Sequence, residues 1–172
     1  YDENITYCIP NSIFLDPLEE SHILKITKTL LPKSSCGHDG ISTKLLKESI
    51  QQIITPITYI INSSLSTGKV PDKLKIAKVV PVYKASDRQL LQNYRPISLL
   101  PAFSKLLEKV MYNKVMNFLT KYNILYEHQY GFRSKHSTIH PVIHLLNHCA
   151  QANNVTPQEF TLVIFCDLSK AF

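Results

Sequence analysis

The sequence lacks the features that mark several classes of protein. Its four cysteines form no C-x-x-C pair and no regular framework, which argues against a disulfide scaffold and indicates reduced, mostly buried thiols of an intracellular protein. No apolar run approaches the ~18 residues of a membrane span, so no membrane partner is expected. There is also no low-complexity tract, internal repeat or signal-peptide pattern. With 44% apolar residues, the chain can instead bury a core.

Basic residues are concentrated in the central third of the chain. Residues 69–121 hold eleven Lys and Arg against three Asp and Glu, whereas the net charge of all 172 residues is +6. A surface that follows a phosphate backbone needs such an excess. Because a solvated Lys-rich surface would have the same composition, charge alone leaves both interpretations open.

The spacing of apolar residues predicts an α+β fold. Helices are expected over residues 16–31, 42–54, 55–65, 103–122 and 137–152, and extended segments over 76–83, 94–100 and 161–166. The first helix is expected to begin at Asp16-Pro17, and Pro81 favours an edge position for its strand. Residues 161–166 are continuously apolar, which is typical of a strand covered on both faces.

Three short motifs indicate a chemistry. They are N-Y-R-P-I-S-L-L-P at 93–101, Q-Y-G-F-R-S-K-H-S-T at 129–138 and T-L-V-I-F-C-D-L-S-K-A-F at 161–172. The last is a short apolar strand that ends in one carboxylate, Asp167, where a sheet can hold a metal ligand. Taken alone, such an Asp is more often a cap or turn residue. In this order and spacing, however, the motifs resemble the reverse transcriptases of non-LTR retrotransposons (long interspersed elements).

This resemblance, which covers roughly residues 33–172, implies the fingers of a right-hand polymerase with the first strand of the palm, truncated. It predicts an N-terminal helical extension over 1–32, fingers over 33–160 and a first palm strand with the catalytic motif over 161–172. The chain has no initial Met and no Asp-Asp pair, which the family carries in its second acidic motif. We therefore expect a fragment that is inactive alone, whose remaining palm and thumb belong to a parent polyprotein.

The resemblance assigns roles to the last residues of the chain. Asp167 would be the catalytic metal ligand, helped by the Leu168 carbonyl, and the complete enzyme would hold two Mg²⁺ ions. The main-chain N–H groups of Lys170 and Ala171 would face the triphosphate. The ring of Phe172 would leave no room for a 2′-hydroxyl and so select deoxynucleotides.

The resemblance also selects basic residues. Lys84 and Arg95 match the cations of the fingers that hold the triphosphate of the incoming nucleotide, for which Arg offers forked contacts. Candidates for nucleic-acid contacts are Lys75, Lys78 and Arg133, although Arg133 would equally suit a buried carboxylate.

Two further patterns remain open. The loop K-S-S-C-G-H-D-G at 33–40 resembles the N-terminal fingers extension of this lineage and would contact template backbone, or would be an ordinary turn. His136, His140, His144 and His148 recur every four residues, a spacing that can bind zinc. Since no Cys or carboxylate completes a ligand set, a solvated or nucleic-acid-facing ridge is favoured.

The sequence thus predicts an RNA-directed DNA polymerase that extends a DNA primer on an RNA template with dNTPs. The parent element would act in the nucleus. Two alternatives remain: a non-catalytic nucleic-acid-binding relic or co-opted module, and a reverse transcriptase like those of group II intron maturases or telomerase.

Overall fold

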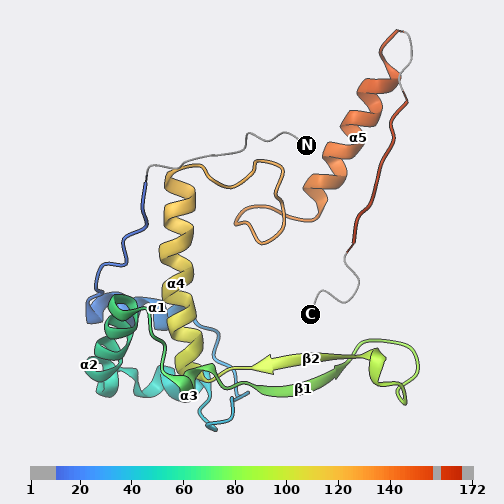
Figure 1. Cartoon of the computed structure of the whole chain (residues 1–172). Helices are drawn as coiled ribbons and strands as arrows, with labels where there is room; N and C mark the ends of the chain where they lie inside the picture. Colours follow the sequence, from blue (N-terminus) through green and yellow to red (C-terminus); the bar gives the residue numbers. More distant parts are fainter. Residues whose placement is uncertain (1–10, 157–159, 168–172) are drawn as a thin grey trace. The chain divides into compact units, whose positions relative to one another are not determined.

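The computed structural model describes residues 11–156 and 160–167. The elements of these residues are, in chain order, α1 (Glu20–Thr29), α2 (Thr43–Thr67), α3 (Asp72–Lys75), β1 (Lys78–Tyr83), a 3-10 turn (Leu91–Asn93), β2 (Tyr94–Leu99), α4 (Ala102–Lys121) and α5 (Ile139–Asn153) (Figure 1). The chain divides into two compact units, residues 1–121 and 122–172. The predicted mixture of helix and strand is confirmed.

The core of the first unit lies where α1, α2 and α4 pack together. Each helix contributes an apolar stripe at helical spacing, and α2 supplies the longest one. The buried apolar residues are Ile23 of α1; Leu46, Ile50, Ile54, Ile57, Ile61 and Leu65 of α2; and Ala102, Leu106, Leu107 and Val110 of α4. The buried residues of α4 lie in its first half, and Val115 in its second half is 38% exposed.

The two helices predicted over 42–54 and 55–65 form one continuous helix, so the predicted break at Pro56 is wrong. The buried stripe of α2 continues through this position, from Ile54 to Ile57. Pro56 lies on the exposed face, where water can bind the carbonyl that loses its helical N–H partner. Burial of the stripe therefore outweighs the local cost of the proline.

The start of α1 also differs from the prediction. The helix begins at Glu20 rather than at Asp16-Pro17. The backbone of Leu18 is held instead by a side chain of α2: Leu18 N–H donates to Asn62 Oδ1 at 2.8 Å, and Asn62 Nδ2 donates to Leu18 O at 2.9 Å. The Asp16 carbonyl accepts from Lys114 Nζ at 2.8 Å. Tertiary hydrogen bonds thus occupy backbone groups that a longer helix would have used.

Strands β1 and β2 pair as an antiparallel hairpin that projects from the helices (Figure 1). Pro81 lies directly opposite Pro96. Lys84 N–H donates to Asn93 O at 2.8 Å, and hydrogen-bonded pairs alternate along an antiparallel ladder, so the Pro81–Pro96 pair is a non-hydrogen-bonded one. Neither proline therefore removes a hydrogen bond between the two strands. Both edges of the sheet lack an N–H donor at the position of this proline pair.

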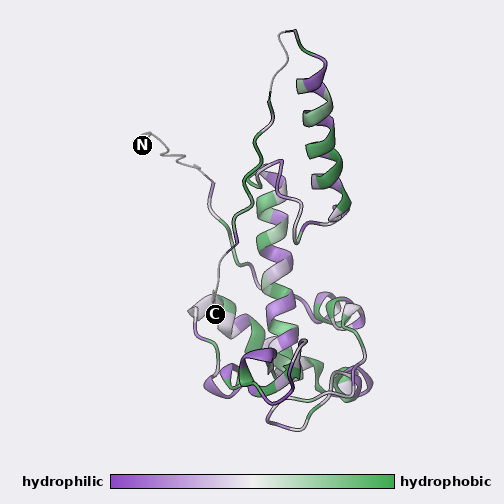
Figure 2. Ribbon diagram, turned by 90° about the vertical axis from the view of Figure 1, so that its right-hand side faces the viewer, coloured by the Kyte–Doolittle hydropathy of each residue, from purple (hydrophilic) through white to green (hydrophobic). Residues whose placement is uncertain are grey.

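The second unit contains α5, which confirms the helix predicted over 137–152. The helix has no buried residue, and much of it is coloured as hydrophobic in Figure 2. Its exposed apolar side chains include Ile139, Val142, Ile143 and Leu146. The strand predicted over 161–166 is not formed: the described residues 160–167 are neither helix nor strand, and Leu162 and Phe165 are 85% and 87% exposed. A strand obtains its ladder bonds from a neighbouring strand, and no described segment pairs with these residues.

The cysteines of the described residues are free thiols. Cys36 and Cys149 are half-buried and Cys166 is exposed, so the expectation of mostly buried thiols is wrong for these three, while Cys8 lies outside the described residues. No helix in the described ranges is long and apolar enough to cross a membrane.

Replacing Leu106 by Ala should test the packing of the core. Leu106 is fully buried on α4, so Leu106→Ala should lower the free energy of unfolding by about 2–5 kcal/mol. The matched control is Leu45→Ala on α2, where the side chain is 51% exposed and the loss should stay below about 1 kcal/mol. Urea unfolding followed by circular dichroism measures both. Equal losses would contradict the described core.

Candidate nucleotide and nucleic-acid interface

The register of the β1–β2 hairpin places Lys84 and Arg95 on one face. Side chains of directly opposed residues share a face, and the face alternates along each strand. Arg95 lies opposite Val82, so these two side chains share a face. The Lys84–Asn93 hydrogen bond extends the pairing beyond Tyr83, and Lys84, two residues after Val82, lies on the same face. Lys84 and Arg95 are therefore diagonal neighbours, with Cβ atoms about 7 Å apart or less. The structure brings together the two cations predicted to hold a triphosphate.

Lys78 extends this group of cations. It lies opposite Leu99 and belongs to the same alternating set as Val80, Val82 and Lys84. The face, which we call the cationic face, thus carries Lys78, Lys84 and Arg95 along roughly 20 Å of strand. All three residues are exposed, and the ion pairs found among the described residues involve none of them.

The opposite face of the hairpin holds its loop in place. Tyr83 and Tyr94 form a cross-strand pair whose rings meet edge to face at 5.7 Å. The Tyr83 hydroxyl donates to Ser86 O, and the Tyr94 hydroxyl donates to Arg88 O at 3.0 Å. The Arg88 guanidinium lies 5.1 Å from the centre of the Tyr83 ring. Arg88 is thus engaged on the far side, while Lys84 and Arg95 remain exposed to a ligand.

The other two predicted nucleic-acid contacts are engaged in local interactions. Lys75 Nζ lies 2.8 Å from Asp72 Oδ1, and this hydrogen bond, together with the charge of Lys75, holds the pKa of Asp72 below its usual value. Arg133 Nη1 donates to Tyr126 O at 3.0 Å and to Glu127 O at 3.4 Å. Arg133 therefore closes its own loop in this structure rather than meeting a buried carboxylate.

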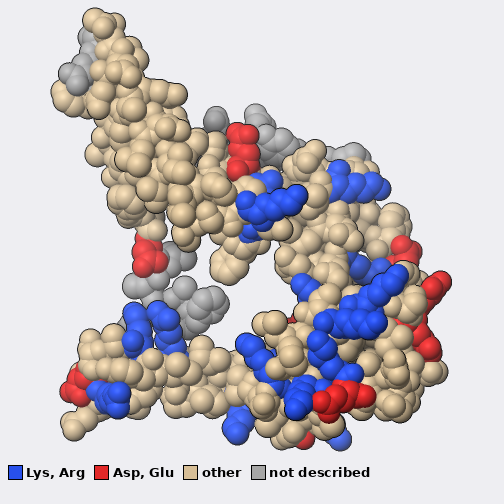
Figure 3. All heavy atoms as spheres, turned by 180° about the vertical axis from the view of Figure 1, so that it is seen from behind, with Lys and Arg blue, Asp and Glu red and all other residues tan. Residues whose placement is uncertain are grey.

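Lys and Arg side chains gather over the first unit, both on the hairpin and over the helices, whereas the surface of α5 in the same view carries none (Figure 3). The α5 sequence contains no charged residue of either sign. The basic excess of residues 69–121 is thus a property of the hairpin, the segment before it and α4. Attraction of a polyanion is expected at the first unit.

Among the five residues at the end of the chain that the resemblance gives a role, Asp167 is the one that the structure describes. Its side chain is exposed. Leu168, Lys170, Ala171 and Phe172 lie outside the described residues. The described part of the chain contains no group of three His, Cys, Asp or Glu residues that could hold a metal ion. A single carboxylate can supply one ligand of a Mg²⁺ ion, but the described residues do not complete a site.

The histidines of α5 and of the turn before it bring their rings together in pairs. The ring centres of His136 and His140 lie 5.8 Å apart, and those of His144 and His148 lie 4.7 Å apart. His128 joins them at 4.9 Å from His144. No group of residues that could hold a metal ion is found in the part of the chain that the structure describes. The solvated or nucleic-acid-facing ridge stays a prediction.

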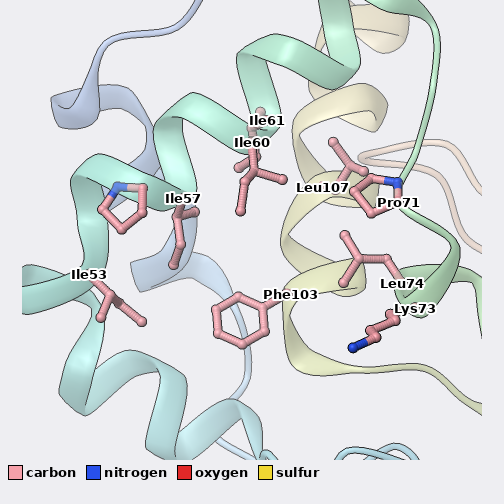
Figure 4. Close-up of a pocket in the computed structure, with 10 residues that line it drawn as sticks. Ile53, Ile57, Ile60, Ile61, Pro71, Lys73, Leu74, Phe103 and Leu107 are labelled. Carbon is pink, nitrogen blue, oxygen red and sulfur yellow. The ribbon is translucent and has the colours of Figure 1, made fainter.

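The first unit also contains an apolar pocket of about 370 Å³ between α2, α3 and α4 (Figure 4). Figure 4 shows Phe103 and Leu107 of α4 facing Ile57 and Ile60 of α2, with Lys73 at the side. An apolar lining does not suit a triphosphate, which needs cations and N–H donors. The pocket is therefore separate in chemistry from the cationic face.

Sequence reasoning missed the two tyrosines and the loop contacts that hold the hairpin. Tyr83 ends one expected extended segment and Tyr94 begins the next, so antiparallel pairing of these segments would have placed them together. Asn93 Nδ2 donates to Asp87 O at 2.6 Å, and Asp87 Oδ1 accepts from Gln89 N–H at 2.9 Å. The turn-forming residues Ser86, Asp87 and Asn93, which lie between the two expected strands, were the available signal for such a turn.

Comparison with known proteins identifies the class. Residues 82–172, more than half of the chain, match the family described as reverse transcriptase (RNA-dependent DNA polymerase). The chain belongs to this family. The match includes Lys84, Arg95 and Asp167 and begins within β1.

Its relatives narrow the class to retrotransposons. The chain is 32% identical over 162 residues to a probable RNA-directed DNA polymerase from transposon BS of Drosophila melanogaster, covering 94% of this chain and 18% of the relative. It is 26% identical to the RNA-directed DNA polymerase from mobile element jockey of Drosophila funebris, covering 91% of this chain and 17% of the relative. It is also 26% identical to a probable RNA-directed DNA polymerase from transposon X-element of Drosophila melanogaster, covering 92% of this chain and 17% of the relative.

These relatives are polymerases of non-LTR retrotransposons, so the resemblance seen in the motifs is confirmed. The chain spans less than a fifth of the length of each of them. It is a reverse transcriptase segment homologous to retrotransposon RNA-directed DNA polymerases.

The cationic face should bind nucleic acid in a salt-dependent way. Fluorescence anisotropy of the chain with an RNA–DNA hybrid should give a negative slope of log affinity against log salt, because bound cations release counterions. Replacing Lys78, Lys84 and Arg95 together by Gln should reduce the slope by about 2 to 3 units, since each lost phosphate contact removes about one.

The matched control replaces Lys25, Lys28 and Lys44, three exposed lysines of α1 and α2, by Gln. Both triple variants lose three positive charges, so a difference between their slopes would come from where the charges lie. An equal decrease of the slope in both would show that binding follows net charge and not the cationic face.

Proposed function

We propose that the β1–β2 hairpin binds the triphosphate of the incoming deoxynucleotide in an RNA-directed DNA polymerase of a non-LTR retrotransposon. The observation that carries the proposal is the common face of Lys84 and Arg95 on the paired β1–β2 ladder. A triphosphate carries several adjacent negative charges, and two cations about 7 Å apart can contact neighbouring phosphate groups. The rigidity of a paired ladder fixes the distance between them.

The exposure of the hairpin supports this role. Lys84 and Arg95 are exposed, so they keep their hydration until an anion replaces it. Arg offers a planar fork of donors that matches two phosphate oxygens, whereas Lys acts as a point charge. Arg95 should therefore orient the triphosphate and Lys84 should add attraction.

In the proposed assignment, residues 1–32 are an N-terminal extension, 33–160 belong to the fingers and 161–172 to the first palm segment. The template is RNA and the primer is DNA, and Lys78 contacts their backbone. The further parts of the palm and the thumb would come from the parent polyprotein, as the much greater length of the relatives suggests.

Asp167 would contribute one carboxylate to a site for two Mg²⁺ ions. When bound, these ions would activate the attacking hydroxyl and neutralise the leaving phosphates. Leu168 would offer its carbonyl, and the N–H groups of Lys170 and Ala171 would face the phosphates. Phe172 would exclude the 2′-hydroxyl of ribonucleotides. The exposed carboxylate of Asp167 is available to an ion, and further carboxylates have to complete the site.

The first test replaces Arg95 by Ala in the complete polymerase that contains this chain. Loss of a charge-assisted phosphate contact should raise the KM for dNTPs roughly ten- to a hundredfold. The matched control is Arg88→Ala, on the same hairpin but held over Tyr83 on the opposite face, which should change the KM less than about threefold. Steady-state primer extension measures both. Similar changes in the two variants would reject the assignment of the cationic face.

The second test separates Asp167 from Phe172 in the same polymerase. Asp167→Asn keeps the shape and removes a metal-binding charge, so incorporation should fall by orders of magnitude while template binding persists. Phe172→Ala should keep dNTP incorporation and admit ribonucleotides. Primer extension with each nucleotide class decides. Near-normal rates for Asp167→Asn would make Asp167 a turn residue, and unchanged discrimination in Phe172→Ala would make Phe172 a packing residue.

A further inference from the structure

One loop contacts both ends of the hairpin where it leaves the helices. The loop, residues 36–42, is the last part of the connection between α1 and α2, and a β-bridge between Cys36 and Ser42 closes it. Its tip is a turn in which Gly40 N–H donates to Gly37 O at 3.4 Å, and Ile41 N–H donates to Asp39 Oδ1 at 3.1 Å. The loop is thus ordered by its own hydrogen bonds.

The first contact lies just before β1. His38 Nδ1 is 3.1 Å from Ile76 O. A carbonyl oxygen only accepts, so Nδ1 carries the proton and donates it. Ile76 lies two residues ahead of Lys78, the first residue of β1.

The second contact lies just after β2. A Cβ at Gly37 would come within 2.7 Å of Pro101 N and 3.0 Å of Leu100 C, both backbone atoms. Leu100 and Pro101 connect β2 to α4. The φ of Gly37 is not positive, unlike that of Gly40 (72°), so Gly37 is required by the lack of space and not by its backbone conformation.

The loop is itself fastened to the longest helix. The Ser42 side chain caps α2 by accepting from Leu45 N–H at 3.1 Å. A separate, partly buried bond joins α3 to α4 nearby, since Ser104 Oγ donates to Leu74 O at 2.6 Å. The hairpin itself, in contrast, is exposed along most of its length and makes no contribution to the buried core. The contacts of the loop at its base are therefore placed to restrain its direction relative to the helices.

We propose that Gly37 and His38 are positioning residues that hold the two ends of the β1–β2 hairpin against α2 and so fix where the cationic face presents Lys84 and Arg95. The consequence for nucleotide binding rests on the proposed function of the hairpin. The positioning itself is independent of it.

The test is hydrogen–deuterium exchange of the 172-residue chain and of single variants. His38→Ala should accelerate exchange of the β1 and β2 amides about two- to tenfold, the effect of one lost hydrogen bond, while the buried part of α2 is unchanged. His38→Asn should restore protection, because its amide nitrogen can donate from nearly the position of Nδ1. Gly37→Ala should act more strongly than His38→Ala, since backbone atoms would have to move. Ser34→Ala, an exposed change just outside the same loop, is the control.

Three results would overturn the proposal: unchanged exchange of the hairpin in both Gly37→Ala and His38→Ala, equal acceleration in α2, or failure of His38→Asn to restore protection. Titration of each variant with dTTP, followed by phosphorus NMR, then tests the link to binding. His38→Ala should weaken dTTP binding and His38→Asn should recover it. If exchange follows the expected pattern while Arg95→Ala leaves the KM of the complete polymerase for dNTPs unchanged, the proposed function fails and the positioning role stands.

Discussion

The antiparallel register of β1 with β2 is the constraint on which the candidate site depends. A slip of one residue would place Lys84 and Arg95 on opposite faces of the ribbon, because the side-chain period of a strand is two. Several features hold the observed register. The two prolines oppose each other where no ladder bond is needed, and Tyr83 and Tyr94 contact each other on the far face and bind the loop. The residues that hold the hairpin are thus separate from those available to a ligand.

The hairpin is exposed and joins a core made by α1, α2 and α4. The apolar stripe of α2 runs unbroken past Pro56 and packs against α1 and α4. Because the core is built by helices alone, the hairpin has little hydrophobic contact of its own to fix its direction. The contacts of Gly37 and His38 at its base supply that restraint. This arrangement suits a part that presents charges to a ligand at its surface.

Much of the candidate site could be predicted from motifs. The blocks at 93–101 and 161–172 identified the family, and the strand segments before Lys84 and around Arg95 were anticipated from β-branched composition. Where prediction failed, tertiary contacts outweighed local signals. Asn62 binds the backbone of Leu18 and shifts the start of α1, and burial of a stripe carries α2 through Pro56. The apolar pattern of 161–166 shows a segment that favours burial, but not whether a neighbouring strand pairs with it.

The sequence by itself determined the family, the apolar faces of the helices and the types of residue that can meet a triphosphate, because these follow from composition and short-range spacing. Only the tertiary structure decided which cations share a face. Pairing register is a long-range property, and Lys78, Lys84 and Arg95 become one group only when β1 and β2 align. The same holds for Gly37: nothing in the residues beside it shows that Pro101 lies too close to admit a Cβ atom.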